Sequence, residues 1–136
     1  MSFWSIAAAF GAAVLVFDAS AATIAQKTGV DYRRFAIGSV LLYAMAGAAV
    51  AFGNGLGSTW PAEASFGVGL VLGVIDSTVG WGISAAIGPG RPSNTAKLVS
   101  NSISKQGMVI RGFLGTIVMS ALVAWLVGLL TSVIAR

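Results

Sequence analysis

Residues 66–88 read FGVGLVLGVIDSTVGWGISAAIG, and this stretch decides the fold class of the chain. It carries a single charged residue, Asp76. About 20 such residues, coiled into a helix, cross the hydrocarbon core of a bilayer. The apolar run is continuous, whereas a strand of a membrane barrel alternates apolar and polar residues over segments of about 10. The stretch therefore predicts a transmembrane α-helix.

Three other stretches have the same character, and we expect helices over residues 3–25, 35–52, 66–88 and 108–135. The composition agrees, because 57% of the 136 residues are hydrophobic and only 9% are charged. A soluble domain has about 25% charged residues and could not bury this much apolar surface at this size. We therefore predict an all-α, polytopic membrane protein with one membrane domain, residues 1–136, built as two helical hairpins.

The composition also excludes several kinds of chemistry. The chain has no cysteine and no histidine, which rules out thiol catalysis, disulfides and serine–histidine triads. The four acidic residues are scattered through the sequence. We expect neither an enzyme nor a bound cofactor. The net charge of +4 does not predict nucleic-acid binding here, because the basic residues flank apolar spans.

The basic residues predict an orientation. Seven of the eight lie in or beside the connections 26–34 and 89–107, whereas the connection 53–65 has none. Cytoplasmic loops of membrane proteins are enriched in Lys and Arg. We therefore expect connections 26–34 and 89–107 in the cytoplasm and both termini outside. After Ser93 or Asn94 the longer connection reads either as a short helix on the membrane surface or as a solvated loop.

The two halves of the chain resemble each other. Residues 11–20, GAAVLVFDAS, align with residues 69–78, GLVLGVIDST, so that Asp18 falls on Asp76. Residues 33–42 and 110–119 match more loosely. This predicts two parallel repeat units, 1–52 and 60–135, related by an axis along the membrane normal. Helices rich in Ala, Gly and Val also align by chance, which is the alternative interpretation.

Asp18 and Asp76 are the strongest functional candidates. A charged Asp at the centre of a spanning helix costs about 2.5–3.5 kcal/mol on insertion scales, so such residues face the bundle or a wet cavity. Small residues share a helix face with each Asp and indicate close packing there, within the chain or between copies. These residues are Gly69, Gly73 and Gly80 beside Asp76, and Gly11 beside Asp18.

The aspartates predict a cation or proton site. The hydroxyl groups of Ser20, Ser77 and Thr78 are candidate additional ligands, and oxygen ligands suit hard cations, although the sequence leaves any metal unidentified. Two structural roles compete with this hypothesis. A protonated Asp can form a hydrogen bond between helices. Alternatively, Asp18 pairs with Arg34 and Asp76 pairs with Arg111.

Two functions follow from these interpretations. The first is a small membrane transporter or channel that binds a cation or proton at the aspartates. Because four short helices enclose little space, we expect a homo-oligomer, with a dimer as the simplest case. The second is a non-catalytic structural or accessory subunit of a larger membrane complex. Its aspartates would be packing or salt-bridge groups. Trp81 either lines a cavity or packs in the core or interface.

Overall fold

The computed structural model describes residues 2–53, 61–87 and 105–134. Apart from Ser2 and residues 29–31, this part of the chain is helical, and it contains no strand. Its elements in chain order are the helix α1 (Phe3–Thr28), the 3-10 turn η1 (Tyr32–Phe35), the helices α2 (Ala36–Gly53) and α3 (Pro61–Ile75), the π-helical turn η2 (Asp76–Gly80), and the helices α4 (Trp81–Ile87) and α6 (Lys105–Ile134).

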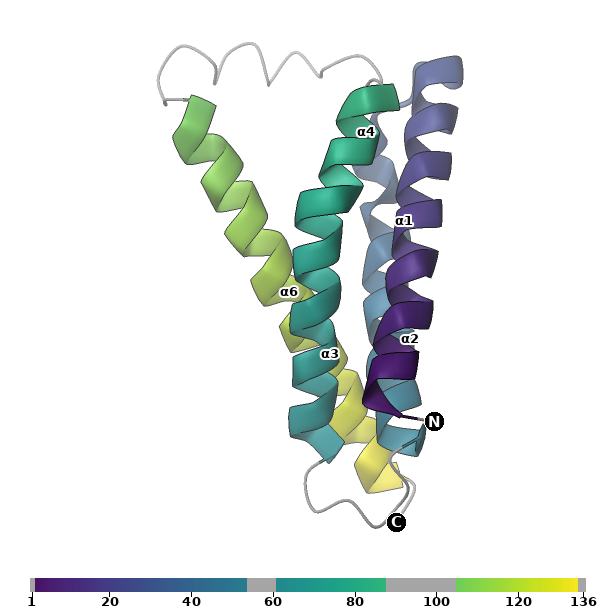
Figure 1. Cartoon of the computed structure of the whole chain (residues 1–136), viewed down its shortest axis with the longest axis vertical. Coiled ribbons are helices and arrows are strands. Elements are labelled where there is room, and N and C mark those ends of the chain that lie inside the picture. The colour runs from purple at the N-terminus through teal and green to yellow at the C-terminus, as the bar shows by residue number, and fades with distance from the viewer. Residues whose placement is uncertain (1, 54–60, 88–104, 135–136) are drawn as a thin grey trace.

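These elements form four continuous helical rods, each long and apolar enough to cross a membrane. They are Phe3–Thr28, Tyr32–Gly53, Pro61–Ile83 and Arg111–Ile134. The sequence-based prediction of four such helices in an all-helical chain is therefore confirmed for the described residues. The start of α1, the end of α2, the start of α3 and the end of α6 lie at one end of the molecule (Figure 1). Successive rods therefore run in opposite directions.

The helix ends differ from the sequence-based boundaries for local reasons. Helix α1 continues to Thr28. The next residue, Gly29, adopts a left-handed conformation (φ 69°) and donates its N–H to the Ala25 carbonyl, which ends the helix. Helix α3 begins at Pro61, because a proline suits the first helical position, where no N–H partner is needed. Helix α6 begins at Lys105, earlier than expected. The possible surface helix after Ser93 or Asn94 lies outside the described residues.

Small residues fill the interior of the bundle. Most of its buried residues are alanine or glycine, and α3 packs most extensively against α6, with α2 beside both. Two buried serines join the backbones across these contacts. Ser120 Oγ donates to the Gly69 carbonyl at 2.8 Å, and Ser65 Oγ donates to the Gly47 carbonyl at 3.0 Å. Small interface residues and hydroxyl bonds of this kind are typical of helices that associate in lipid.

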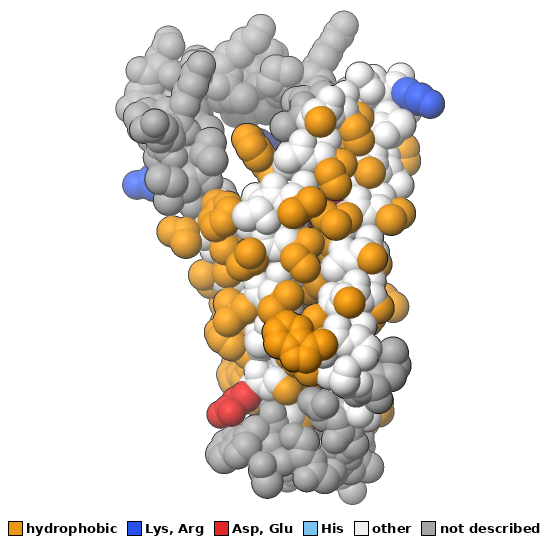
Figure 2. Space-filling model, in the orientation of Figure 1, with side chains coloured by type: hydrophobic (Ala, Val, Ile, Leu, Met, Phe, Trp, Pro, Cys, Tyr) orange, Lys and Arg blue, Asp and Glu red, His pale blue; other side chains and the backbone are white. Residues whose placement is uncertain are grey.

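Large apolar side chains cover the outside. Ile37 is 72% exposed and Ile134 is 84% exposed, and many other Leu, Val, Met and Trp side chains are also exposed. Figure 2 shows hydrophobic side chains along the height of one face, with Lys and Arg toward the upper end and an acidic side chain near the lower end. Such an exterior would be unfavourable in water.

Helix α6 leaves the bundle at one end. Its C-terminal part packs closely on α3 and α2, whereas its N-terminal part diverges from α4, so that α6 and α4 form a V (Figure 1). The open end of the V is the end where α1 finishes and α2 begins. Lys27, Arg33 and Arg34 therefore lie at the open end. This divergence creates the cavity described next.

A carboxylate pair beside an aromatic cavity

A π-helical turn interrupts the third rod at Asp76. The N–H of Trp81 donates to the Asp76 carbonyl, five residues earlier, instead of following the four-residue spacing of an α-helix. The turn carries Asp76 at its start and Gly80 at its end. Both residues contact the region of α1 around Asp18. Single π-turns inside long helices frequently mark functional sites.

The carboxyl groups of Asp18 and Asp76 meet at Gly80. A methyl group on Gly80 would overlap Oδ2 of Asp18 and would lie 3.0 Å from Oδ1 of Asp76. Asp18 is 1% exposed, and Asp76 is partly buried. The missing side chain of Gly80 therefore provides the space in which the two carboxyl groups, from the first and third rods, come together.

Each aspartate accepts a hydrogen bond from a tyrosine. The hydroxyl of Tyr32, on η1, donates to Oδ1 of Asp18 at 3.1 Å. The hydroxyl of Tyr43, on α2, donates to Oδ2 of Asp76. The site is thus a cluster of two carboxyl and two phenol groups contributed by α1, η1, α2 and η2. We refer to these four residues as the Asp–Tyr cluster.

One oxygen of the cluster lacks a donor. Oδ2 of Asp18 is buried, and no hydrogen-bond donor in the described part of the chain reaches it. Its carboxyl group interacts with that of Asp76. Two ionised carboxylates placed so close together would repel each other, whereas a single proton on one of them would form a hydrogen bond between them. The geometry therefore suits a pair that holds one proton and one negative charge.

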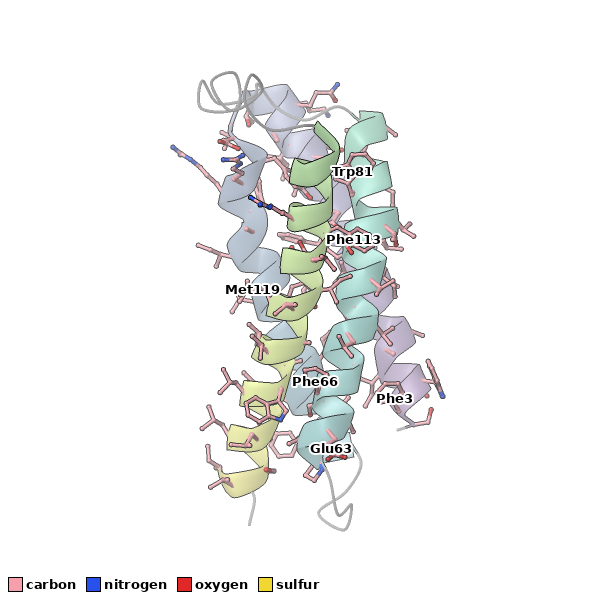
Figure 3. The ribbon with its side chains drawn as sticks, turned by 90° about the vertical axis from the view of Figure 1, so that its left-hand side faces the viewer. Phe3, Glu63, Phe66, Trp81, Phe113 and Met119 are labelled. Carbon is pink, nitrogen blue, oxygen red and sulfur yellow. The ribbon has the colours of Figure 1, made fainter. Side chains whose placement is uncertain are left out.

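A cavity of about 970 Å³ adjoins the cluster. It lies between α2, α4 and α6, where α6 diverges, and Asp76 forms part of its wall. Aromatic side chains supply much of the rest, and Figure 3 shows two of them, Trp81 and Phe113, in the upper half, with Met119 nearer the middle. Arg33 and Arg111 also line the cavity, and both are exposed. Asp18 is not part of the wall and lies behind Asp76.

The hydroxyl groups proposed as ligands bind their own helices. Ser20 Oγ donates to the Val16 carbonyl at 2.8 Å and is exposed away from the cavity. Thr78 Oγ1 donates to the Val74 carbonyl at 2.6 Å, and Ser77 Oγ donates to the Gly73 carbonyl. Ser77 and Thr78 nevertheless line the cavity. The structure thus brings the two aspartates together and places Ser77 and Thr78 nearby, but not Ser20.

The arginines proposed as ion-pair partners lie at the open end. Arg34 is exposed, and the side chain that donates to the Asp18 carboxyl is Tyr32. Arg111 shares the cavity wall with Asp76, whose carboxyl accepts from Tyr43. In the described part of the chain, each of the two carboxyl groups thus accepts a hydrogen bond from a phenol group.

The glycine face of the third rod has two different partners. Cβ atoms on Gly69 or Gly73 would collide with α6, at Ser120, Ala121 and Ile117, so these two glycines allow α3 and α6 to approach. Gly80 faces the carboxyl of Asp18 instead, and Gly11 of α1 lies against the Ile75 side chain. The face is thus used within the chain, for packing at one end and for the carboxylate pair at the other.

Sequence reasoning missed the two tyrosines. Tyr43 is 3% exposed and lies near the middle of an apolar span, although tyrosines of membrane helices usually gather at the interfaces. A buried phenol needs a hydrogen-bond partner, so the position of Tyr43 inside the span was the available signal of a polar site. Tyr32 offers no comparable signal, because it sits in a basic connection where an interfacial tyrosine is ordinary.

No protein-family model, curated protein or solved structure matches this chain. What it can do must therefore be inferred from the geometry. That geometry is a helical bundle with an apolar exterior, a pair of carboxyl groups of which one is buried and one partly buried, and an aromatic cavity open near one end.

Proposed function

We propose that this chain is a small multi-pass membrane transporter whose Asp18–Asp76 pair binds and releases a proton during transport. The observation that carries the proposal is the meeting of two carboxyl groups, from separate spans, beside a cavity that includes Asp76 in its wall. Ionisable groups inside a membrane are costly and commonly mark proton or ion pathways. A purely structural role would not need a cavity next to the pair.

The ligands favour a proton over a metal ion. The described residues contain no group of three or more acidic side chains that could hold a metal. The nearby hydroxyl groups donate to helix carbonyls, and the two phenols donate to the carboxyl groups. Hard cations prefer six or more oxygen ligands or a shell of retained water. A proton needs only the two carboxyl groups.

The test uses three single substitutions. Asp18→Asn and Asp76→Asn each remove one ionisable group but keep the shape and most hydrogen bonds. Asp31→Asn is the matched control, because Asp31 only caps η1, through Arg33 N–H at 3.0 Å, and asparagine caps equally well. Proton flux under an imposed potential would be followed with a pH-sensitive dye inside vesicles containing the purified protein. Infrared difference spectra would report protonated carboxyl groups.

We expect the two pair variants to abolish proton flux and the carboxyl infrared band, whereas Asp31→Asn retains both. The pair variants should unfold within about 1 kcal/mol of the wild type, because the side-chain hydrogen bonds in the cluster are kept and such bonds are worth about 0.6–2 kcal/mol. Folded pair variants with full proton flux would refute the proposal. They would favour the alternative of an accessory subunit with packing aspartates.

The orientation belongs to the same proposal. The open end of the cavity carries Lys27, Arg33 and Arg34, so the positive-inside rule assigns it to the cytoplasm. Because the chain has no cysteine, single cysteines at Ser2 and Thr28 can be labelled with a reagent that cannot cross the membrane. Ser2 should react from outside intact cells, and Thr28 only after the membrane is opened. The reverse pattern would overturn this orientation.

The internal repeat and the dimer are further parts of the proposal. The carboxyl groups of Asp18 and Asp76 both lie beside Gly80, which supports parallel units 1–52 and 60–135. The units are not equivalent in detail, since Asp76 opens a π-turn and Asp18 lies within the regular helix α1. A second copy would cover apolar surface and help to enclose a pathway.

A further inference from the structure

We propose that the cavity binds a hydrophobic aromatic organic cation, with Asp76 as its counter-ion. This inference rests on the proposed transport function and names the class of substrate that shares the carboxylate pair with the proton. It follows from three features: the aromatic wall, the position of the negative charge, and the different exposure of the two aspartates.

The wall of the cavity suits a flat or bulky apolar ligand. Six aromatic side chains line it: Phe17, Tyr32, Phe35, Tyr43, Trp81 and Phe113. Its volume of about 970 Å³ lies near the upper end of the roughly 300–1,000 Å³ found for drug-sized ligands. The negative faces of aromatic rings attract cations, and this attraction is stronger for a ligand that has left water.

The charges of the cavity favour a cation at its inner wall. Asp76 is partly buried, so its negative charge is only weakly screened. The side chains of Arg33 and Arg111 are exposed, where water, counter-ions and lipid phosphates screen them. A ligand lying among the aromatic rings therefore meets the carboxylate more directly than it meets the guanidinium groups.

The two aspartates of the pair differ in their position relative to the cavity and therefore in their proposed roles. Asp76 lines the cavity, while Asp18 is buried behind it and receives the Tyr32 hydrogen bond. With one proton held between them, the remaining negative charge can face the ligand through Asp76. A second proton would neutralise the pair and release the cation. Among the described residues, the titratable and charged groups facing this site besides Asp18 and Asp76 are Tyr32, Tyr43, Arg33 and Arg111.

This arrangement makes an asymmetric prediction. Asp76→Asn removes the charge from the cavity wall and should weaken cation binding at least about tenfold, the scale of one charge contact in a partly buried site. Asp18→Asn should leave binding within about threefold of the wild type. The asparagine amide can donate to Asp76 as a protonated Asp18 would, and Asp76 keeps its carboxyl group at the cavity wall. A merely structural role would not separate the two variants.

The experiment compares two probes of the same shape and opposite charge. Tetraphenylphosphonium and tetraphenylborate binding would be measured by equilibrium dialysis on the full-length protein in a neutral detergent. Trp81→Ala tests the aromatic wall and should weaken phosphonium binding about three- to tenfold. Trp125→Ala is the matched control, because Trp125 lies on α6, is 37% exposed and is not part of the cavity wall.

We expect phosphonium binding that is weakened at least about tenfold in Asp76→Asn, retained in Asp18→Asn and unaffected by Trp125→Ala. Equal or tighter binding of the borate would overturn the inference, because the arginines would then dominate the cavity. Absence of phosphonium binding would also overturn it. If proton flux still depends on the pair in that case, the proposed function survives and only the substrate class fails. Asp76-dependent phosphonium binding by a protein that carries no protons would support the cation site and refute proton transport.

Discussion

Replacing Gly80 with alanine should abolish proton flux and lower the free energy of unfolding by about 1–3 kcal/mol, the usual cost of overpacking. The added methyl group would overlap Oδ2 of Asp18 and lie 3.3 Å from its Cγ and 3.0 Å from Oδ1 of Asp76. The Asp18 side chain is short and 1% exposed, so it cannot turn into open space. The carboxyl groups must separate, and the proton that we propose they share then has no second oxygen.

Gly82→Ala is the matched control for this substitution. Gly82 lies in the same rod, two residues further along, and outside its own helical turn no atom of the described residues lies within 4 Å of its Cβ position. Alanine is better than glycine in a helix by about 1 kcal/mol, so this variant should be neutral or slightly more stable and should carry protons normally. Flux in reconstituted vesicles and unfolding in mixed micelles would measure both properties. Normal proton flux in Gly80→Ala would contradict the proposed role of the Asp18–Asp76 pair in proton transport.

Replacing Gly69 with alanine should destabilise the bundle by about 3 kcal/mol, at the upper end of the range for overpacked cores. Its Cβ would lie 2.5 Å from the Ser120 carbonyl oxygen and 2.7 Å from the Ala121 Cα, both backbone atoms of α6. Backbone atoms cannot rotate away, so α3 and α6 would have to move apart. That movement would also break the bond from Ser120 Oγ to the Gly69 carbonyl.

Two comparisons separate packing from hydrogen bonding at this crossing. Ser120→Ala removes the hydroxyl alone and should cost about 0.6–1.7 kcal/mol, the measured range for such bonds in membrane bundles. Gly115→Ala adds a methyl on α6 at a position where, outside its own helical turn, no described atom lies within 4 Å, and it should be tolerated. Unfolding in mixed micelles gives the three free energies. A Gly69→Ala variant no less stable than Ser120→Ala would show that α3 and α6 are not closely packed.

Local properties of the sequence were enough for the helices. A continuous apolar run satisfies its backbone hydrogen bonds only as a helix, and the run length sets the span, so four helices could be predicted without knowing their neighbours. The errors were at helix ends and at the π-helical turn Asp76–Gly80, which interrupts the third span. At Pro61 and Gly29 the outcome depends on which residue occupies one capping position, a detail that hydropathy does not report.

The candidate site was predicted only in part. Asp18 and Asp76 stand out because a charge inside an apolar helix is costly wherever the helix lies. Closeness in sequence to the aspartates suggests three hydroxyl groups as further ligands, those of Ser20, Ser77 and Thr78. These groups instead donate to carbonyls of their own helices. A hydroxyl in a helix can always reach the carbonyl one turn earlier, and this local bond competes with any distant ligand.

The amino-acid sequence by itself therefore determined the four spanning helices, their apolar exterior and the two aspartates. Each of these depends on whether a segment or side chain is more stable in lipid or in water. Only the tertiary structure decided that Asp18 and Asp76 meet at Gly80, that Tyr32 and Tyr43 are their donors, and that an aromatic cavity opens beside them. Those features depend on the relative rotation and tilt of the rods. Interlocking of small residues between helices sets that geometry, and no single segment encodes it.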